Sequence, residues 1–400
     1  MRFPRSTYID RLARLRDTDL IKVITGVRRS GKSTLLLLYA AHLQEQGVPA
    51  EQIIKIDFDD KKNEYLLDKD ILYNYIVDRV KGKQPHYIFL DEIQMVKDFN
   101  LTLNSIKLLG NTDIYITGSN AHLLSSEIST LLTGRHIDLE LRPLSFSEFY
   151  WLDGESFSKE DSFIRYLEYG GFPGVYELLN IDSQLVHQYI QTLIQDILTK
   201  DILVRKKIQN IEAMTRLVSF LGSTVGSSVS SKNIANVLAG EKLAVSHNTV
   251  LDYIAYLNEC FLFSKCSRFD ISGKAVLRTH FKEYAVDNAL ISVYGPDRNI
   301  GYRLENLVYN ELCARGYDVY TGKLYNGEVD FIAKRNHERM YIQVCYLLAN
   351  EGTIGREFGA FKSIRDSYPK LVLSMDRFDF SQNGIQHQSI VDWLLGNAQV

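Results

Sequence analysis

The segment GVRRSGKST, residues 26–34, follows a short apolar run and precedes a leucine-rich segment. It matches the pattern G-x-x-x-x-G-K-[ST], whose last three positions are Gly31, Lys32 and Ser33. Glycines in such a loop let successive backbone N–H groups point at an anion, and the N-terminus of the following helix adds partial positive charge. The segment therefore predicts a phosphate-binding loop between a strand and a helix, as in an α/β fold with the parallel sheet of P-loop NTPases.

The residue types of this loop indicate which ligand it takes. Lys32 is expected to reach the β and γ phosphates, and the Ser33 hydroxyl is expected to ligate Mg²⁺. Backbone N–H groups can bind the phosphates without Arg28 or Arg29. These two arginines therefore either add positive charge beside the triphosphate or stay solvated. The sequence has no Asn-Lys-x-Asp guanine-reading motif, which favours ATP over GTP. The residues predicted to bind the nucleotide are Gly26, Arg28, Arg29, Ser30, Gly31, Lys32, Ser33 and Thr34.

A second apolar segment, 86–90, ends in the acidic pair Asp91 and Glu92. A buried parallel strand of this kind opens at its carboxyl end onto the nucleotide site. Asp91 is then expected to hold Mg²⁺, and Glu92 to orient or deprotonate the attacking water. Alone, such a pair would indicate a plain turn, but the upstream loop favours the functional interpretation.

Three further polar residues are candidates for the same site. The strand-like segment 113–118 is followed by Ser119 and Asn120, where a hydrolase could sense the γ-phosphate; an ordinary polar strand exit is the alternative. Arg135 could stabilise transition-state charge, either in its own chain or from a neighbouring subunit. A surface arginine paired with an acid is the simpler interpretation of Arg135.

Composition limits the class of protein. The chain has 400 residues, of which 45% are hydrophobic and 24% are charged, with a net charge of -3. This net charge is not that of a strongly basic, nucleic-acid-binding chain. Any nucleic-acid partner must therefore be inferred from local features of the sequence. No run approaches the roughly 18 apolar residues of a membrane helix, and we expect a cytoplasmic protein without membrane contact. The four cysteines form no C-x-x-C pair and are interpreted as buried thiols.

The middle of the chain reads as helix, turn, helix and short strand over residues 230–263. The second helix is predicted to begin after Ser246, with apolar residues on one face and His247, Asn248 and Thr249 free at its start. This is how a recognition helix approaches base edges. The helix carries an aspartate and no Arg or Lys, which is poor for phosphate contact. Double-stranded DNA and a protein partner both remain open.

Several segments together resemble a prokaryotic family of AAA-like P-loop ATPases whose C-terminal half has no characterised function. They are GVRRSGKST, YIFLDEIQ, YITGSNAHLL, LTGRHIDLELRPLSFSEF, RLENLVYNEL, GEVDFI and YIQVCY. The resemblance implies an ATPase core, a helical lid, a winged helix-turn-helix and a C-terminal α/β domain similar to PD-(D/E)XK nucleases. The expected domains are 1–145 for the ATPase, 146–225 for the lid, 226–272 for the winged helix and 273–400 for the nuclease-like part.

The C-terminal segment matches the order of a PD-(D/E)XK core, with a helix over 303–312 followed by three strands. The resemblance implies that Glu305 and Asp330 stand at the first two acidic positions. Gln343 and Cys345 replace the acid and the lysine of the last motif. A neutral amide is a weaker Mg²⁺ ligand than a carboxylate, so we expect a degenerate site. Lys362 could substitute for the missing lysine.

Three functions remain open from the sequence. The first is an ATP-driven, Mg²⁺-dependent molecular switch or motor associated with DNA, and it rests on Lys32, Ser33, Asp91 and Glu92. The second is a nuclease whose ATPase regulates access. The third is a non-enzymatic regulator that binds ATP and DNA or a protein. Oligomeric state is undecided, although a homo-oligomer would make Arg135 act between subunits.

Overall fold

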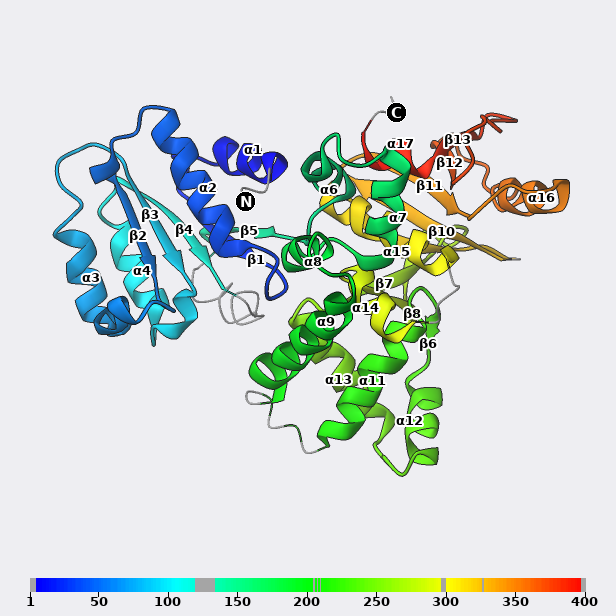
Figure 1. The fold of residues 1–400 in the computed structure, drawn as a ribbon, viewed down its shortest axis with the longest axis horizontal. Helices are drawn as coiled ribbons and strands as arrows, with labels where there is room; N and C mark the ends of the chain where they lie inside the picture. The colour runs from blue at the N-terminus through cyan, green and yellow to red at the C-terminus, as the bar shows by residue number, and fades with distance from the viewer. Residues whose placement is uncertain are drawn as a thin grey trace. The chain divides into compact units, whose positions relative to one another are not determined.

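The computed structural model describes residues 5–118, 134–203, 206, 208, 210–295, 300–325 and 327–396. The contacts between residues divide the protein into two compact units, Met1–Arg142 and Pro143–Val400. Each unit is built around its own β-sheet (Figure 1).

The first unit contains a five-stranded sheet in the order β2-β3-β4-β1-β5, and every neighbouring pair is parallel. Parallel strands need crossover connections, which the intervening helices provide. Its elements are α1 (Ser6–Arg14), β1 (Ile21–Thr25), α2 (Lys32–Glu45), η1 (Ala50–Gln52), β2 (Ile53–Asp57), η2 (Lys61–Leu67), α3 (Lys69–Val77), β3 (His86–Asp91), η3 (Ile93–Met95), α4 (Phe99–Lys107), β4 (Thr112–Thr117) and β5 (His136–Glu140). The predicted α/β parallel sheet is confirmed.

Helices cover both faces of this sheet. Leu72 and Ile76 of α3, together with Leu103 of α4, pack against one face. Leu35 and Tyr39 of α2 belong to the hydrophobic cluster on the other face. Because both faces are covered, every residue of β1 and β3 is buried, and the strands lack the alternation of a half-exposed sheet. The carboxyl ends of the strands are left to carry polar residues.

The second unit contains an eight-stranded mixed sheet in the order β13-β12-β11-β10-β9-β7-β8-β6. Its helices are α6 (Phe146–Asp153), α7 (Lys159–Tyr169), α8 (Pro173–Leu179), α9 (Gln184–Ile197), the π-helical turn η5 (Leu198–Leu203), α11 (Ile211–Ser223), α12 (Ser231–Gly240), α13 (His247–Glu259), α14 (Asn288–Tyr294), α15 (Ile300–Ala314), α16 (Glu351–Gly359) and α17 (Ile390–Leu394). Its strands are β6 (Ser228–Val229), β7 (Phe263–Asp270), β8 (Ala275–Ala285), β9 (Asp318–Lys323), β10 (Glu328–Arg335), β11 (Glu338–Val344), β12 (Lys370–Ser374) and β13 (Gln386–Ser389).

The expected helix-turn-helix lies at α12 and α13, and each helix has a serine N-cap. Ser246 accepts the N–H of Thr249 at 3.0 Å, and the hydroxyls of the two residues lie 2.9 Å apart. His247 and Asn248 are exposed, whereas Thr249 is half-buried. Only the first two residues of the predicted contact surface are therefore fully accessible.

The hairpin of β7 and β8 continues directly into the C-terminal strands, because β7 also pairs in parallel with β9. The predicted boundary between 272 and 273 falls in the turn between β7 and β8. The structure thus joins the strands on either side of it in one sheet. The four-domain division remains a prediction, and the winged-helix and nuclease-like classes are not confirmed.

A buried polar network links the predicted lid to the rest of the second unit. Asp287 accepts the N–H groups of Gly171 and Ala289, each at 2.8 Å. Arg303 donates to the carbonyls of Leu167 and Glu168 at the end of α7, at 3.3 and 2.8 Å. Arg303 thus satisfies carbonyls that a helix C-terminus leaves unpaired, and Asp287 satisfies backbone N–H groups. The glycine pair after α7 therefore ends the helix and lets an aspartate approach its backbone closely.

No helix among the described residues has the length and apolar character needed to cross a membrane. All four cysteines are free thiols; Cys260, Cys266 and Cys345 are buried and Cys313 is partly exposed. The prediction of buried thiols is therefore confirmed for three of the four.

Candidate active site

The predicted loop connects β1 to α2, and its backbone is held close to the next strand segment. Gly26 has a φ of 135°, and a Cβ on it would lie 2.2 Å from the carbonyl oxygen of Leu141. Gly31, with a φ of 98°, is the N-cap of α2 and provides no side-chain cap. Glycine is required at both positions because other residues rarely adopt positive φ. The first turn of α2 thus directs backbone N–H groups toward the loop.

Lys32 lies folded against its own loop and is only 5% exposed. Its ammonium donates to the carbonyl oxygens of Gly26 and Val27, at 3.0 and 3.1 Å. Ser30 is fully buried, and its carbonyl accepts from Arg5 at 2.7 Å. The Ser30 Oγ has no hydrogen-bond partner among the described groups.

Asp91 ends β3 and is buried beside the loop. Thr117, at the end of β4, donates its hydroxyl to Asp91 Oδ1. Burial raises the pKa of Asp91, and Glu92 and Asp57 add to that shift, whereas hydrogen bonds with Ser33 and Thr117 oppose it. The structure thus brings together Ser33 and Asp91, the two predicted Mg²⁺ ligands. A hydroxyl and a carboxylate are hard oxygen donors, which Mg²⁺ prefers.

Glu92 directly follows Asp91 in a left-handed conformation, with a φ of 55°. Its N–H donates to Thr117 Oγ1 at 3.0 Å. Its carboxylate accepts from the side-chain amide of Gln94. Glu92 is therefore fixed at its backbone by one strand and at its carboxylate by the turn that follows.

Other acids lie at the same edge of the sheet. Asp57 ends β2 in register with Asp91, and the backbone N–H of Asp59 donates to Asp57 Oδ1 at 2.9 Å. Burial raises the pKa of Asp59, with Glu92 and Asp57 adding to the shift, and the positive charge of Arg28 opposes it. Arg28 thus lies within electrostatic reach of the acids, whereas Arg29 is exposed with a φ of 68°.

Four of these residues were not predicted from the sequence. Thr117 and Gln94 lie inside motifs that were singled out, YITGSN and YIFLDEIQ. A threonine and a glutamine are common at strand ends and turns, so neither gave a signal alone. Asp57 and Asp59 become candidates only when β2 is known to pair with β3.

The remaining nucleotide-site candidates are placed differently. Ser119 and Asn120 lie outside the described residues. Arg135 is exposed, and its carbonyl accepts the N–H of Ile21, the first residue of β1. The loop follows the last residue of β1, about 16 Å farther along a strand of this length. The structure therefore does not bring Arg135 to the loop within its own chain, and a role from a neighbouring copy stays a prediction.

The predicted C-terminal residues do converge. Glu305 comes from α15, Asp330 from β10 and Gln343 from β11. Gln343 Oε1 accepts the backbone N–H of Asp330 at 3.3 Å, and Asp330 Oδ2 accepts that of Val344 at 2.8 Å. Burial and the nearby Glu305 charge raise the pKa of Asp330 well above its ordinary value.

A lysine that sequence analysis did not identify lies among these acids. Lys282 of β8 forms ion pairs with Glu305 at 3.1 Å and with Glu328 at 2.9 Å. Burial opposes its charge, but Glu305, Glu328 and Asp330 outweigh that effect and raise its pKa. Among the described residues, no group of three or more His, Cys, Asp or Glu side chains is arranged to hold a metal ion. The cluster is therefore compensated by a cation of the protein itself.

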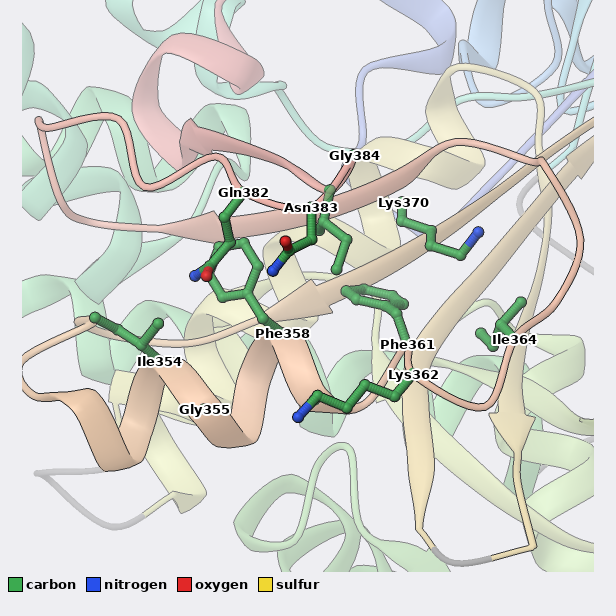
Figure 2. A pocket seen from close by; sticks show the side chains of 12 residues that line it. Ile354, Gly355, Phe358, Phe361, Lys362, Ile364, Lys370, Gln382, Asn383 and Gly384 are labelled. Atoms are coloured by element: carbon green, nitrogen blue, oxygen red, sulfur yellow. The ribbon is translucent and has the colours of Figure 1, made fainter.

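Lys362, the proposed substitute, lies elsewhere. It follows α16 and lines a pocket of about 400 Å³ between α16 and the turn at 382–385 (Figure 2). Phe358 and Phe361 provide apolar walls, and Lys370 and Asn383 provide polar ones. The charges that shift the pKa of Asp330 are those of Glu305, Lys282 and Glu357. Lys282 is thus the lysine that the fold places beside the acids.

The first unit has the geometry of a nucleotide site, and its sequence places it in a known class. Residues 18–150 match the AAA domain family, and residues 160–295 match a domain of unknown function, DUF8612. The chain is a P-loop NTP hydrolase of the AAA class, an ATPase with a nucleotide-binding domain.

Relatives extend the match to nearly the whole chain. An uncharacterized protein of Haemophilus influenzae is 36% identical over 98% of both chains. The uncharacterized protein MJ1544 of Methanocaldococcus jannaschii is 30% identical, over 86% of this chain and 79% of its own. The chain belongs to the family of these proteins. Among solved structures, it is similar to the Walker-type ATPase PABY2304 of Pyrococcus abyssi, with 16% identity, a TM-score of 0.48, and coverage of 73% of this chain and 95% of that one.

Proposed function

We propose that the chain is an ATP-driven molecular switch whose hydrolysis depends on Mg²⁺ and whose second unit binds a DNA partner. The observation that carries the hydrolytic part is the convergence of Ser33, Asp91 and Glu92 at one edge of the sheet, linked through Thr117. The residues there fit the proposed ligands. The α2 N-terminus and Lys32 provide positive charge for phosphates, and the hydroxyl and carboxylate provide oxygen donors.

In this mechanism Lys32 leaves its two loop carbonyls and donates instead to phosphate oxygens. Ser33 and Asp91 would hold Mg²⁺, which supplies charge neutralisation at the β and γ phosphates. Glu92 accepts a proton from the attacking water. Arg28 and the exposed Arg29 add positive potential on the approach to the loop.

Measurements of ATP binding and of ATP turnover test this assignment. Lys32→Ala should lower ATP turnover by at least about 100-fold, because it removes a charge that stabilises the transferring phosphoryl group. Glu92→Gln should keep ATP binding and lose hydrolysis, since it retains shape but not basicity. Turnover is measured as phosphate release, and binding with a fluorescent ATP analogue. Wild-type turnover in Lys32→Ala would exclude the loop as the site.

The proposal that the second unit binds DNA rests on α12, α13 and the β7–β8 hairpin. The exposed His247 and Asn248 begin α13, where a recognition helix contacts base edges. Exposed lysines occur nearby in the chain, at Lys232, Lys242 and Lys274. Their charge suits phosphate contacts, which make binding weaken steeply with salt.

Gel-shift titration of the full chain with double-stranded DNA, at rising salt, tests this part. We expect His247→Ala with Asn248→Ala to reduce sequence preference more than total binding, and Lys274→Ala to reduce binding to all sequences. A protein partner is the alternative occupant. No DNA binding at low salt would favour it.

A further inference from the structure

In the turn after β3, one side-chain amide has a hydrogen-bond partner for its nitrogen but none for its oxygen among the described protein groups. Gln94 lies in η3, two residues after Glu92. Its amide nitrogen donates to Glu92 Oε2. Its Oε1 is buried and has no hydrogen-bond partner among the described protein groups. A buried carbonyl oxygen without a partner costs about 1–3 kcal/mol, so its retention needs a reason.

Chemistry fixes which end of the amide faces Glu92. An ionised carboxylate only accepts hydrogen bonds, so the NH₂ group must face it and the carbonyl oxygen must point away. The backbone makes this short-range contact possible. Glu92 has a φ of 55°, and the 3₁₀ turn that follows brings the side chain of residue 94 back toward that of residue 92.

The same glutamate is fixed from a second direction. The N–H of Glu92 donates to Thr117 Oγ1 at 3.0 Å, which ties its backbone to the end of β4. Gln94 thus contacts its carboxylate, while Thr117 contacts its main chain. A left-handed non-glycine residue costs about 1–3 kcal/mol and persists where the surroundings determine it.

We propose that Gln94 is a positioning residue for ATP hydrolysis. Its amide N–H holds the Glu92 carboxylate in the orientation in which that carboxylate takes a proton from the attacking water. The proposal rests on Glu92 as the base. The water oxygen then bonds to the γ-phosphorus, and the bond from that phosphorus to the β–γ bridging oxygen breaks. The electron pair leaves with ADP, and the water proton moves to Glu92.

The bond from Gln94 limits the rotation of the Glu92 carboxylate, so that the base keeps one orientation toward the water. Orientation of this kind raises the rate of the chemical step and leaves the affinity for the nucleotide unchanged. Loss of Gln94 should therefore lower kcat and leave nucleotide affinity nearly unchanged. A turn-stabilising role alone would instead lower the melting temperature and leave kcat of the folded protein unchanged.

The experiment compares Gln94→Leu and Gln94→Glu with wild type in the full chain. Leucine removes the donor and the acceptor, while glutamate keeps the size and an acceptor oxygen but places a second carboxylate beside Glu92. We expect kcat to fall about tenfold or more in both variants, because neither leucine nor an ionised glutamate can donate to the Glu92 carboxylate and hold its orientation. Affinity for a fluorescent ATP analogue should change less than about threefold, and the melting temperature only slightly. Gln44→Leu, at an exposed site in α2, is the matched control.

The outcomes separate this proposal from the assignment of Glu92. If Glu92→Gln is slow but both Gln94 variants turn over like wild type, only the role of Gln94 fails. If Glu92→Gln itself hydrolyses ATP normally, the base assignment fails. Faster turnover in Gln94→Leu would also overturn the proposal, because it would mean that Gln94 restrains Glu92.

Discussion

Thr117 is the residue on which the geometry of both acids depends. Its hydroxyl donates to Asp91 and accepts the N–H of Glu92, and the residue is fully buried. Thr117→Val keeps the shape but leaves two buried polar groups without their partner, at about 1–3 kcal/mol. We expect turnover to fall about tenfold and the Mg²⁺ concentration for half-maximal activity to rise.

Thr117→Ser provides the control, because it keeps the hydroxyl and removes only a methyl group. Phosphate release measured against MgCl₂ concentration should place the serine variant close to wild type. If valine and serine variants lose the same activity, packing of the methyl group rather than the hydroxyl would be responsible.

At the scale of elements, two glycines that end neighbouring helices make a matched pair. Gly154 ends α6 with a φ of 56°, and a Cβ there would meet nothing within 4 Å. Gly170 ends α7 with a φ of 80°, and its Cβ would lie 1.7 Å from Asp287 Oδ1. Gly154→Ala should therefore cost only the backbone strain, about 1–3 kcal/mol. Gly170→Ala should cost about 3 kcal/mol or more, because Asp287 must also move.

Denaturant unfolding of both variants measures this difference. Equal losses of stability would show that the close approach of Asp287 to the end of α7 contributes nothing beyond the strain. Asp287→Asn would then also be neutral, since its two backbone hydrogen bonds would be dispensable.

Strand β8 carries a buried acid that predicts a pH dependence of stability. Glu283 is 1% exposed, and burial raises its pKa to about 8, although the hydrogen bond from Asn258 and the charge of Lys265 oppose the shift. Asn258 Nδ2 lies 3.3 Å from Glu283 Oε1, and Oε2 has no hydrogen-bond partner among the described groups. The folded protein therefore keeps a proton that the unfolded chain releases near pH 4.5.

Because the folded state binds more protons between these pKa values, the free energy of unfolding falls as pH rises through that window. The slope approaches about 1.4 kcal/mol per pH unit. Glu283→Gln should remove this contribution. As pH rises from about 5 to about 8, the free energy of unfolding of this variant should fall less than that of wild type. Denaturant midpoints across this range measure it, and parallel curves for both proteins would contradict the prediction.

These elements show what the sequence could predict. The loop, Asp91 and Glu92 were predicted because their motif is local and its chemistry is specific. The helix expected to begin after Ser246 and the helix expected over 303–312 were confirmed because their periodicity and the serine cap are also local. The partners Asp57 and Thr117 depend on strand order, which no short stretch of sequence encodes.

At the scale of the whole molecule, one sheet of the second unit contains strands from both the expected winged helix and the expected nuclease-like part. Strand β7 pairs with β8 and with β9. This pairing brings Lys282 to the C-terminal acids from outside the motif that was examined. A long-range ion pair of this kind cannot be predicted from spacing, because nothing near Lys282 in the chain indicates its partners.

That lysine determines the prediction for the C-terminal cluster, which is that the protein does not cleave DNA efficiently with Mg²⁺ or Mn²⁺. The ammonium of Lys282 already forms ion pairs with Glu305 and Glu328, so a divalent cation would have to compete with a charge held by the fold. Gln343 contributes a neutral amide where a carboxylate would bind a hard cation more strongly. The test incubates the purified full chain with each metal and with supercoiled, linear and branched DNA, beside an active nuclease as a positive control. Metal-dependent cleavage that disappears in Asp330→Ala would contradict the prediction and make the second unit a nuclease, whereas cleavage that persists in that variant would identify a contaminant.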